Sequence, residues 1–206
     1  MGCAGLILAG GQGSRMGGRD KAFCPLAGRP LIAHVCDRLA RQGVRLAISA
    51  NGDAGRFARF GLPVLADPMP GFPGPLAGVL AGLDWARALG FGGVVSVAVD
   101  TPFFPEDLVA RLLAPGGAAV AAAADDQGVI RRHPTAAFWP VTVAPALRDW
   151  LASGERRLGG FARAVGAAEV VFARETDPLA TDALAPDPFA NINTPDDLAR
   201  AEERLR

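Results

Sequence analysis

Short apolar runs that alternate with helical patterns are the feature that most constrains the fold of this chain. Runs rich in aliphatic residues predict strands at residues 6–8, 46–49, 63–65, 94–99 and 118–123. Helical spacing of apolar residues predicts helices at residues 30–42, 76–89 and 106–113, with a short helix near Phe57. Because the strands are apolar on both faces, we expect an α/β fold of three layers, a Rossmann-like, mostly parallel sheet with helices on both faces.

The rest of the chain is expected to belong to the same unit. A length of 206 residues fits one domain with a sizeable core, so we expect residues 1–206 to form a single domain. Residues 173–188 are rich in Ala, Asp and Pro and show no apolar period, which predicts a surface loop. Thr194 then caps a last helix with Pro195 at its first position.

Composition excludes several classes of protein. The chain has 21 basic and 21 acidic residues, so no global field favours nucleic acid or a membrane as partner. Cys3, Cys24 and Cys36 form no paired motif, which argues against a disulfide framework or a thiolate metal site. The first apolar run stops at Gly10, too short for a signal segment or a spanning helix. We therefore expect a cytoplasmic protein.

The carboxyl ends of the predicted strands are where a ligand is expected. In open parallel sheets, ligands bind just outside this edge. The segments that follow the strands there are residues 10–21, 51–52, 67–74 and 100–102. They are rich in glycine, amides, carboxylates and cations, so we expect the functional site among them.

The first of these segments is rich in glycine. The five glycines between residues 10 and 18 allow successive backbone N–H groups to converge on an anion, most naturally a phosphate. Neither common glycine loop fits: the dinucleotide fingerprint needs Gly where Met16 stands, and the P-loop needs Ser or Thr after Gly-Lys, whereas Ala22 follows Lys21. The alternative is a glycine hinge with solvated arginines.

The stretch "LAGGQGSRMGGRDKAFCPLAGRPLIAHVCDRL" resembles the opening signature of nucleotidyltransferases with a GT-A-like fold. It is most similar to that of the molybdenum cofactor guanylyltransferases. The resemblance continues in order through "ADPMPGFPGPLAGVLAGL", "DTPFFPEDLVARL", "HPTAAFWP", "LASGERRL" and "NINTP". Several separated motifs in one order are far more specific than one glycine loop.

The resemblance implies a fold, a reaction and a set of ligands. The fold is that of the nucleotide-diphospho-sugar transferases. The reaction is transfer of GMP from GTP to the terminal phosphate of molybdenum-loaded molybdopterin, with release of pyrophosphate and use of Mg²⁺. The product is the molybdopterin guanine dinucleotide cofactor. The resemblance also allows for protein partners that deliver the pterin or act as molybdoenzyme chaperones.

The residues are compatible with this chemistry. A phosphate monoester is largely dianionic at pH 7, because its second pKa is about 6, so no side chain has to deprotonate the nucleophile. Positioning and charge neutralisation then suffice. Of the two histidines, we expect His34 to serve packing or capping, and His133 is the better placed for a substrate role.

Three charged residues are the candidate catalytic groups. Asp100 follows a buried strand, where a carboxylate can bind a hard cation that bridges phosphates. Lys21 would neutralise the triphosphate, and Arg15 can donate a fork of hydrogen bonds to phosphate oxygens. The alternatives are a helix cap for Asp100, and for Lys21 or Arg15 a pair with Asp20 or a surface acid.

The resemblance extends to candidate ligand-binding residues. On the GTP side the matching positions are Leu8, Ala9, Gly10, Lys21, Asn51, Asp67 and Asp100. On the pterin side they are Arg156, Asn191 and Asn193, with Arg157 in the same motif as Arg156. The alternatives are a plain turn at Asn51, solvated arginines, and asparagines that cap a helix.

Two other classes of function stay open on the sequence alone. One is a cytidylyl or sugar-phosphate nucleotidyltransferase of the same fold. The other is a non-catalytic carrier of a nucleotide or pterin, which would bind its ligand without releasing pyrophosphate.

Overall fold

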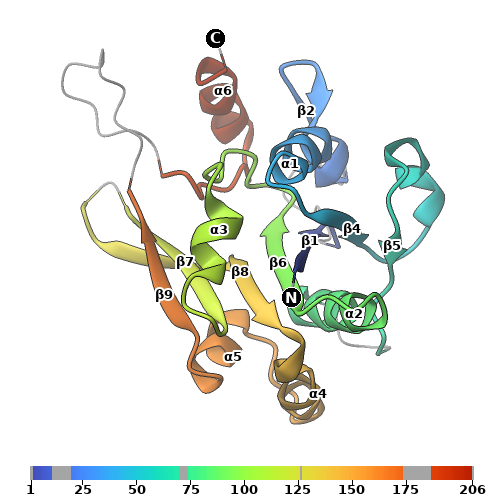
Figure 1. The fold of residues 1–206 in the computed structure, drawn as a ribbon. Helices are drawn as coiled ribbons and strands as arrows, with labels where there is room; N and C mark the ends of the chain where they lie inside the picture. The colour runs from blue at the N-terminus through green and yellow to red at the C-terminus, as the bar shows by residue number, and fades with distance from the viewer. Residues whose placement is uncertain (1, 11–19, 70–73, 126, 174–186, 206) are drawn as a thin grey trace.

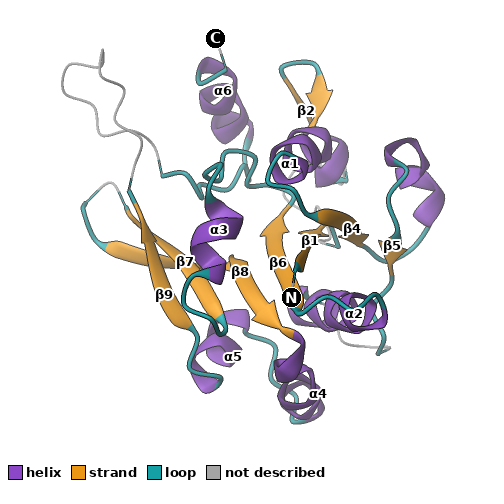
Figure 2. Ribbon diagram, in the orientation of Figure 1, coloured by secondary structure: helices purple, strands orange, loops and turns teal. Residues whose placement is uncertain are grey.

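The computed structural model describes residues 2–10, 20–69, 74–125, 127–173 and 187–205 (Figures 1 and 2). In these ranges, the main sheet consists of β1 (Cys3–Leu8), β4 (Arg45–Ser49), β5 (Val64–Leu65), β6 (Gly93–Ala98), β7 (Ala119–Ala124), β8 (Ile130–Pro140) and β9 (Ala168–Phe172). A small hairpin is formed by β2 (Pro25–Leu26) and β3 (Arg29–Pro30). The helices are α1 (Leu31–Ala40), α2 (Pro75–Ala88), α3 (Leu108–Leu113), α4 (Ala144–Ala152), α5 (Leu158–Ala164) and α6 (Pro195–Glu203). Short 3₁₀ helices are η1 (Lys21–Phe23), η2 (Ala54–Phe60) and η3 (Val141–Val143).

The sheet has the strand order β5-β4-β1-β6-β8-β7-β9. Neighbouring strands are parallel except at β8, which runs antiparallel to both β6 and β7. The predicted fold class, a mostly parallel sheet of the α/β type, is therefore confirmed. From β1 the chain builds outward to β4 and β5 and then returns to the other side of β1 to form β6, so the direction of winding switches between β1 and β6.

Helices cover both faces of the sheet, which gives the three predicted layers (Figure 2). On one face, α1 and α3 pack on side chains such as Ile7, Ile48 and Val97. On the other face, α2, α4 and α5 pack on a second cluster that contains Leu6 and the fully buried Trp139. Strand residues alternate between the two clusters because successive side chains of a strand point to opposite faces.

The second half of the sheet differs from the sequence prediction. Strands β8 and β9 and helices α4 and α5 are not among the predicted elements. The first half of β8 is exposed and carries Arg131 and Arg132, so it lacks the apolar signal of a buried strand. The expected helix at residues 106–113 begins only at Leu108, after Asp107. The predicted loop at residues 173–188 falls mainly outside the described ranges.

Helix α6 packs near the start of the chain, and the segment before it reaches the end of β6 (Figure 1). Thr194 caps this helix as predicted: its Oγ1 accepts from the N–H of Asp197, and its own N–H donates to Asp197 Oδ2. Ala201 of α6 packs with Leu26 of β2 and Leu31 of α1, so helix, hairpin and α1 form a third cluster (Figure 1). Ile192, just before α6, donates its N–H to the carbonyl of Asp100 at 2.9 Å. Among the described helices, none has the length and apolar character needed to cross a bilayer.

Gly93, the first residue of β6, provides a test of the close packing of the sheet. A Cβ atom there would clash with the carbonyl oxygen of Trp139 and lie 2.6 Å from Cε2 of Phe138. Because a carbonyl in a paired strand cannot move away, we expect Gly93→Ala to lower the free energy of unfolding by about 1–3 kcal/mol. Gly117→Ala is the control, since a Cβ there meets no atom within 4 Å. Urea unfolding should show a change of at most about 0.5 kcal/mol for the control, and equal effects would contradict this packing.

Candidate active site

Three neighbouring strands end level with one another at one edge of the sheet. Leu8, the last residue of β1, pairs with Ser49 of β4 on one side and with Ala98 of β6 on the other. Beyond the strands, Ala9 donates its N–H to the carbonyl of Ser49 at 2.9 Å, and Val99 donates to Leu8 at 3.1 Å. The residues that follow these strands therefore meet at the switch point of the sheet, where ligands bind in open α/β folds.

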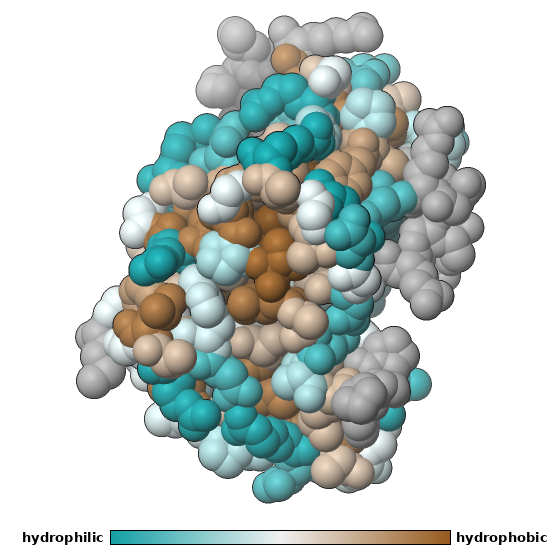
Figure 3. Space-filling model, turned by 90° about the vertical axis from the view of Figure 1, so that its right-hand side faces the viewer, coloured by the Kyte–Doolittle hydropathy of each residue, from teal (hydrophilic) through white to brown (hydrophobic). Residues whose placement is uncertain are grey.

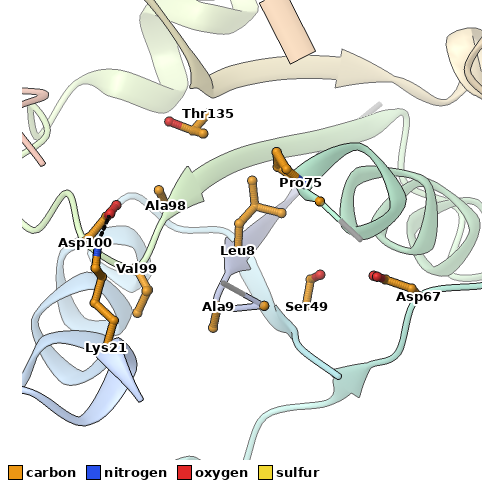
Figure 4. A pocket seen from close by; sticks show the side chains of 12 residues that line it. Leu8, Ala9, Lys21, Ser49, Asp67, Pro75, Ala98, Val99, Asp100 and Thr135 are labelled. Carbon is orange, nitrogen blue, oxygen red and sulfur yellow. Dashed lines mark hydrogen bonds and ion pairs between the residues drawn. The ribbon is translucent and has the colours of Figure 1, made fainter. Parts of the chain in front are cut away.

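A cavity of about 220 Å³ lies at this edge (Figure 4). Its lining residues come from β1, β4, β6 and the loops around them, with Thr135 of β8: they are Leu8, Ala9, Gly10, Lys21, Ser49, Asp67, Gly74, Pro75, Ala98, Val99, Asp100 and Thr135. Figure 4 shows Lys21 and Asp100 at one end of the cavity and Asp67 at the other, with Leu8 and Ala9 between them. The face of the molecule seen in Figure 3 is hollowed, with hydrophobic atoms inside the hollow and hydrophilic side chains around it.

Lys21, Asp100 and Asn193 form the charged end of the cavity. Lys21 Nζ donates to Asp100 Oδ2 at 2.8 Å and to Asn193 Oδ1 at 2.5 Å. Both members of the ion pair are mostly shielded, with side chains only 19% and 15% exposed. In such a setting a charge is poorly screened, so this end can interact strongly with an anionic ligand or a cation.

Local structure explains how these side chains are held. Asp20 caps η1 by accepting from the N–H of Ala22 at 3.1 Å, which fixes Lys21 at the first position of η1. Asp100 lies two residues beyond the end of β6, and the next helix starts only at Leu108, so Asp100 does not cap it. Asn193 does not cap α6 either. Its N–H donates to Asp197 Oδ2 at 2.9 Å, which leaves the side-chain amide free to face Lys21.

Asn51 and Asp67 form the opposite, polar end. Asn51 Nδ2 donates to Asp67 Oδ2 at 2.7 Å, and the N–H of Asp67 donates back to Asn51 Oδ1 at 3.0 Å. Gly52, which follows, has φ 83°, in the left-handed region, and the side chain of Asn51 holds Asp67 at the cavity wall. The free lone pairs of this carboxylate can accept hydrogen bonds from ligand hydroxyl or amino groups.

The N-terminus of α2 lies beside the cavity, where Gly74 and Pro75 are part of the lining. The helix approaches the sheet closely because Gly78 has no side chain. A Cβ atom at this position would collide with Ser49 Oγ. Residues 70–73 of the segment 67–74 lie outside the described ranges.

Comparisons with known proteins agree with this geometry. The family model of the MobA-like NTP transferase domain matches residues 5–170. The chain belongs to this family. A molybdenum cofactor guanylyltransferase of Cereibacter sphaeroides is 53% identical over 202 residues, covering 98% of this chain and 96% of that protein. A protein of the same name from Rhodobacter capsulatus is 54% identical over 204 residues, with the same coverage. The resemblance drawn from the motifs is therefore confirmed, and the chain is a nucleotidyltransferase.

Solved structures share the fold. The molybdopterin-guanine dinucleotide biosynthesis protein A of Archaeoglobus fulgidus has a TM-score of 0.72 at 24% identity, over 98% of both chains. The 4-diphosphocytidyl-2C-methyl-D-erythritolsynthase of Anaerococcus prevotii has a TM-score of 0.70 at 14% identity, over 99% of this chain and 96% of that one. At such identities the similarity concerns the fold alone.

In this MobA-like chain the structure brings most of the predicted site residues together. Leu8, Ala9, Gly10, Lys21, Asp67 and Asp100 line the cavity, and Asn51 and Asn193 contact lining residues. Asn191 accepts from Thr101 Oγ1 at 2.9 Å, beside Asp100. Arg156 and Arg157 are exposed before α5 and do not line the cavity. Arg15 lies outside the described residues.

Two lining residues with hydroxyl side chains, Ser49 and Thr135, were not predicted from the sequence. Ser49 ends a strand that was predicted, so its place at the strand end was an available signal. Thr135 belongs to β8, which was not predicted as a strand. Its carbonyl accepts from Ser96 Oγ at 2.9 Å, and this contact ties the wall of the cavity to β6.

His133 of β8 lies two residues before Thr135 but is not one of the residues that line the cavity. Its ring stacks on Phe189 at a centroid distance of 4.9 Å, and its Nε2 lies 3.5 Å from Asp187 Oδ2. Burial lowers the pKa of His133 below its usual value, and the carboxylate of Asp187 opposes this shift. His34 has the packing role we expected, with Nε2 within 2.9 Å of the carbonyl oxygen of Leu26.

The lowered pKa of His133 predicts a loss of stability in mild acid. The unfolded state binds a proton near pH 6.5, at a higher pH than the folded state does, so unfolding becomes easier as the pH falls below that value. We expect His133→Gln to show a smaller fall in the free energy of unfolding than the wild type between about pH 7.5 and about pH 5.5. Denaturant titrations of both proteins at each pH measure this dependence. Identical pH profiles for the two proteins would refute the assignment.

Proposed function

We propose that the chain transfers GMP from GTP to the terminal phosphate of molybdenum-loaded molybdopterin, forming molybdopterin guanine dinucleotide and releasing pyrophosphate. The observation that carries this proposal is the polarity of the cavity: the ion pair of Lys21 and Asp100 lies at one end and Asp67 at the other. The guanylyltransferases to which the chain is about half identical support the choice of substrates.

The charged end of the cavity suits the triphosphate of a nucleotide, and the polar end suits its base and ribose. We assign the triphosphate to Lys21 and Asp100, because an ammonium group neutralises phosphate oxygens as a point charge. We assign the base and ribose to the end formed by Asn51 and Asp67. The strand-end backbone of Leu8 and Ala9 lies between them and offers apolar surface and main-chain groups to the bound nucleotide.

A divalent cation fits the donor set at the phosphate end, and we propose that it is Mg²⁺. In the described part of the chain, no three or more His, Cys, Asp or Glu side chains cluster as a metal cage. Mg²⁺ needs no such cage, since it usually binds through one or two carboxylates together with substrate phosphates and water. Asp100 would hold it, and the cation would neutralise charge that develops on the phosphates.

The protein's part in the reaction is to position charged groups. The attacking phosphate already carries the negative charge of a nucleophile, and no histidine lines the cavity among the described residues. Lys21 can leave Asp100 for the phosphates of GTP, because Asn193 Oδ1 keeps a second hydrogen bond to the same ammonium. Asp100 then becomes available to the cation.

The pterin is proposed to bind on the side of Asn191 and Asn193. Both precede α6, and Asn193 reaches the phosphate end through Lys21. Arg156 is assigned to the same substrate on the family motif. The three cysteines are buried and unpaired, which supports a reducing cytoplasm as the setting of the reaction.

Removal of the charge of Asp100 tests the metal assignment. We expect Asp100→Asn to lower kcat by at least about 10³-fold while the fold is kept, because the amide has nearly the same shape but no charge for the cation. Asp149→Asn, at an exposed position of α4, should leave the rate unchanged. Pyrophosphate release and thermal unfolding measure both properties. Near-normal turnover of Asp100→Asn at saturating Mg²⁺ would contradict the assignment.

Nucleotide choice tests the proposed function itself. With molybdenum-loaded pterin and equal GTP and CTP, we expect guanine dinucleotide to be the main product. A site built to hydrogen-bond one base can reject another by roughly 10⁴-fold, since its buried polar groups would stay unpaired. Mass spectrometry of the products identifies the base. A cytosine dinucleotide would reassign the chain to the cytidylyl activity, and binding without release of pyrophosphate would make it a carrier.

A further inference from the structure

The guanidinium of Arg56, on η2, contacts both Asn51, at the polar end of the cavity, and Asp20, the residue before Lys21. Its Nη2 donates to the carbonyl oxygen of Asn51 at 3.0 Å. Its Nη1 lies 3.0 Å from Asp20 Oδ2, with the two charges in contact. Asn51 holds Asp67 at the polar end, and Asp20 directly precedes Lys21 at the phosphate end. One side chain that does not line the cavity thus contacts Asn51 of the polar end and Asp20, the residue before Lys21 of the charged end.

The contact with Asp20 is more than a surface ion pair. Asp20 Oδ2 is shielded from solvent and meets Arg56 as a charge rather than in hydrogen-bond alignment, while Oδ1 caps η1 through Ala22. The Arg56 side chain is 33% exposed and its guanidinium lies over the ring of Phe57, 4.7 Å from the centroid. Phe57 is fully buried. The guanidinium is therefore held in one place by a ring, a carbonyl and a carboxylate.

We propose that Arg56 is a positioning residue for the nucleotide, which fixes the base end of the cavity relative to Lys21. This inference rests on the proposed function, because it assumes that a nucleotide spans from Asp67 to Lys21. An arginine suits this task, since its planar fork donates in two directions at once, whereas a lysine ammonium is a single point of charge. Without Arg56, Asn51 and Asp20 would keep their local contacts but would lose their connection.

Arg59 provides a matched control on the same helix. Its guanidinium also lies over aromatic rings, 5.4 Å from the centroid of Phe23 and 5.0 Å from that of Phe60. Among the described residues it forms no ion pair with Asp20 and no hydrogen bond with Asn51. The rings of Phe23 and Phe57 stack with their centroids 5.3 Å apart. This contact between η1 and η2 is kept when either arginine is changed. A difference between the two variants then reports the polar link and not the packing.

The experiment compares Arg56→Gln, Arg56→Lys and Arg59→Gln in the complete protein. We expect kcat/KM for GTP to fall by about 10- to 100-fold in Arg56→Gln, because a small misplacement of reacting groups costs that much. The KM for the pterin should change by less than about twofold, since the pterin side does not contact Arg56. Arg56→Lys should recover part of the loss, and Arg59→Gln should stay within about twofold of the wild type. Melting temperatures of the two Gln variants should agree.

Two further measurements distinguish positioning of the nucleotide from general stabilisation of the fold. They are the preference for GTP over CTP and the energetic coupling between Arg56 and Asp20. We expect the preference for GTP over CTP to fall by at least about tenfold in Arg56→Gln and to be kept in Arg59→Gln. Asp20→Asn keeps the cap on η1 and removes the charge that faces Arg56. Adding Arg56→Gln to Asp20→Asn should therefore lower kcat/KM by less than about threefold, as expected for partners in one contact.

The outcomes separate this inference from the proposed function. If the wild type makes no guanine dinucleotide, the proposed function is wrong, and the inference, which rests on it, is overturned with it. If the wild type is active and Arg56→Gln behaves like Arg59→Gln, the inference alone is overturned. Additive effects of Arg56→Gln and Asp20→Asn, or an unchanged preference for GTP, would also overturn it.

Discussion

The ion pair of Lys21 and Asp100 is the contact on which the rest of the site depends. It joins η1, near the start of the chain, to the end of β6, and Asn193 adds the segment before α6 to the same ammonium. These three segments are far apart in sequence and meet only because β1 and β6 are neighbours and α6 packs on the hairpin and α1. Both side chains are mostly shielded from solvent, so an uncompensated charge on either would be costly. Each therefore neutralises the other in the free protein.

This arrangement fits a site for a polyanion that arrives with a cation. In the free protein the ammonium of Lys21 and the carboxylate of Asp100 neutralise each other. When phosphates and a cation bind, the ammonium can pair with the phosphates and the carboxylate with the cation. Asn193 can retain Lys21 during that exchange, because its amide oxygen accepts from the same nitrogen. The opposite end, where Asn51 fixes Asp67 through two hydrogen bonds, is already in place before any ligand binds. Pre-formed groups of this kind need little reorganisation during binding or reaction.

The first half of the sheet and most of the cavity could be predicted from the sequence because both leave local signals. Strands β1, β4 and β6 are mainly apolar, and Gly10, Asn51 and Asp100 each lie two residues beyond a strand end. Strand β8 left no such signal, because the solvated first half of that strand is polar, and Thr135 was missed with it. Asn193 was assigned to the pterin side, and the structure shows in addition that its amide oxygen accepts from Lys21 Nζ. A side chain's partner across 172 positions leaves no trace in local pattern.

The sequence by itself therefore determined the fold class, the edge of the sheet at which a ligand would bind, and the family of the enzyme. Periodicity, strand ends and motif order are local properties, and local physical rules govern them. Only the tertiary structure decided that Lys21 faces Asp100, that Asp67 is held by Asn51, and that Arg56 contacts both Asn51 and Asp20. Such pairings depend on strand order and on the packing of helices, because these set which distant side chains come within a few ångströms of one another.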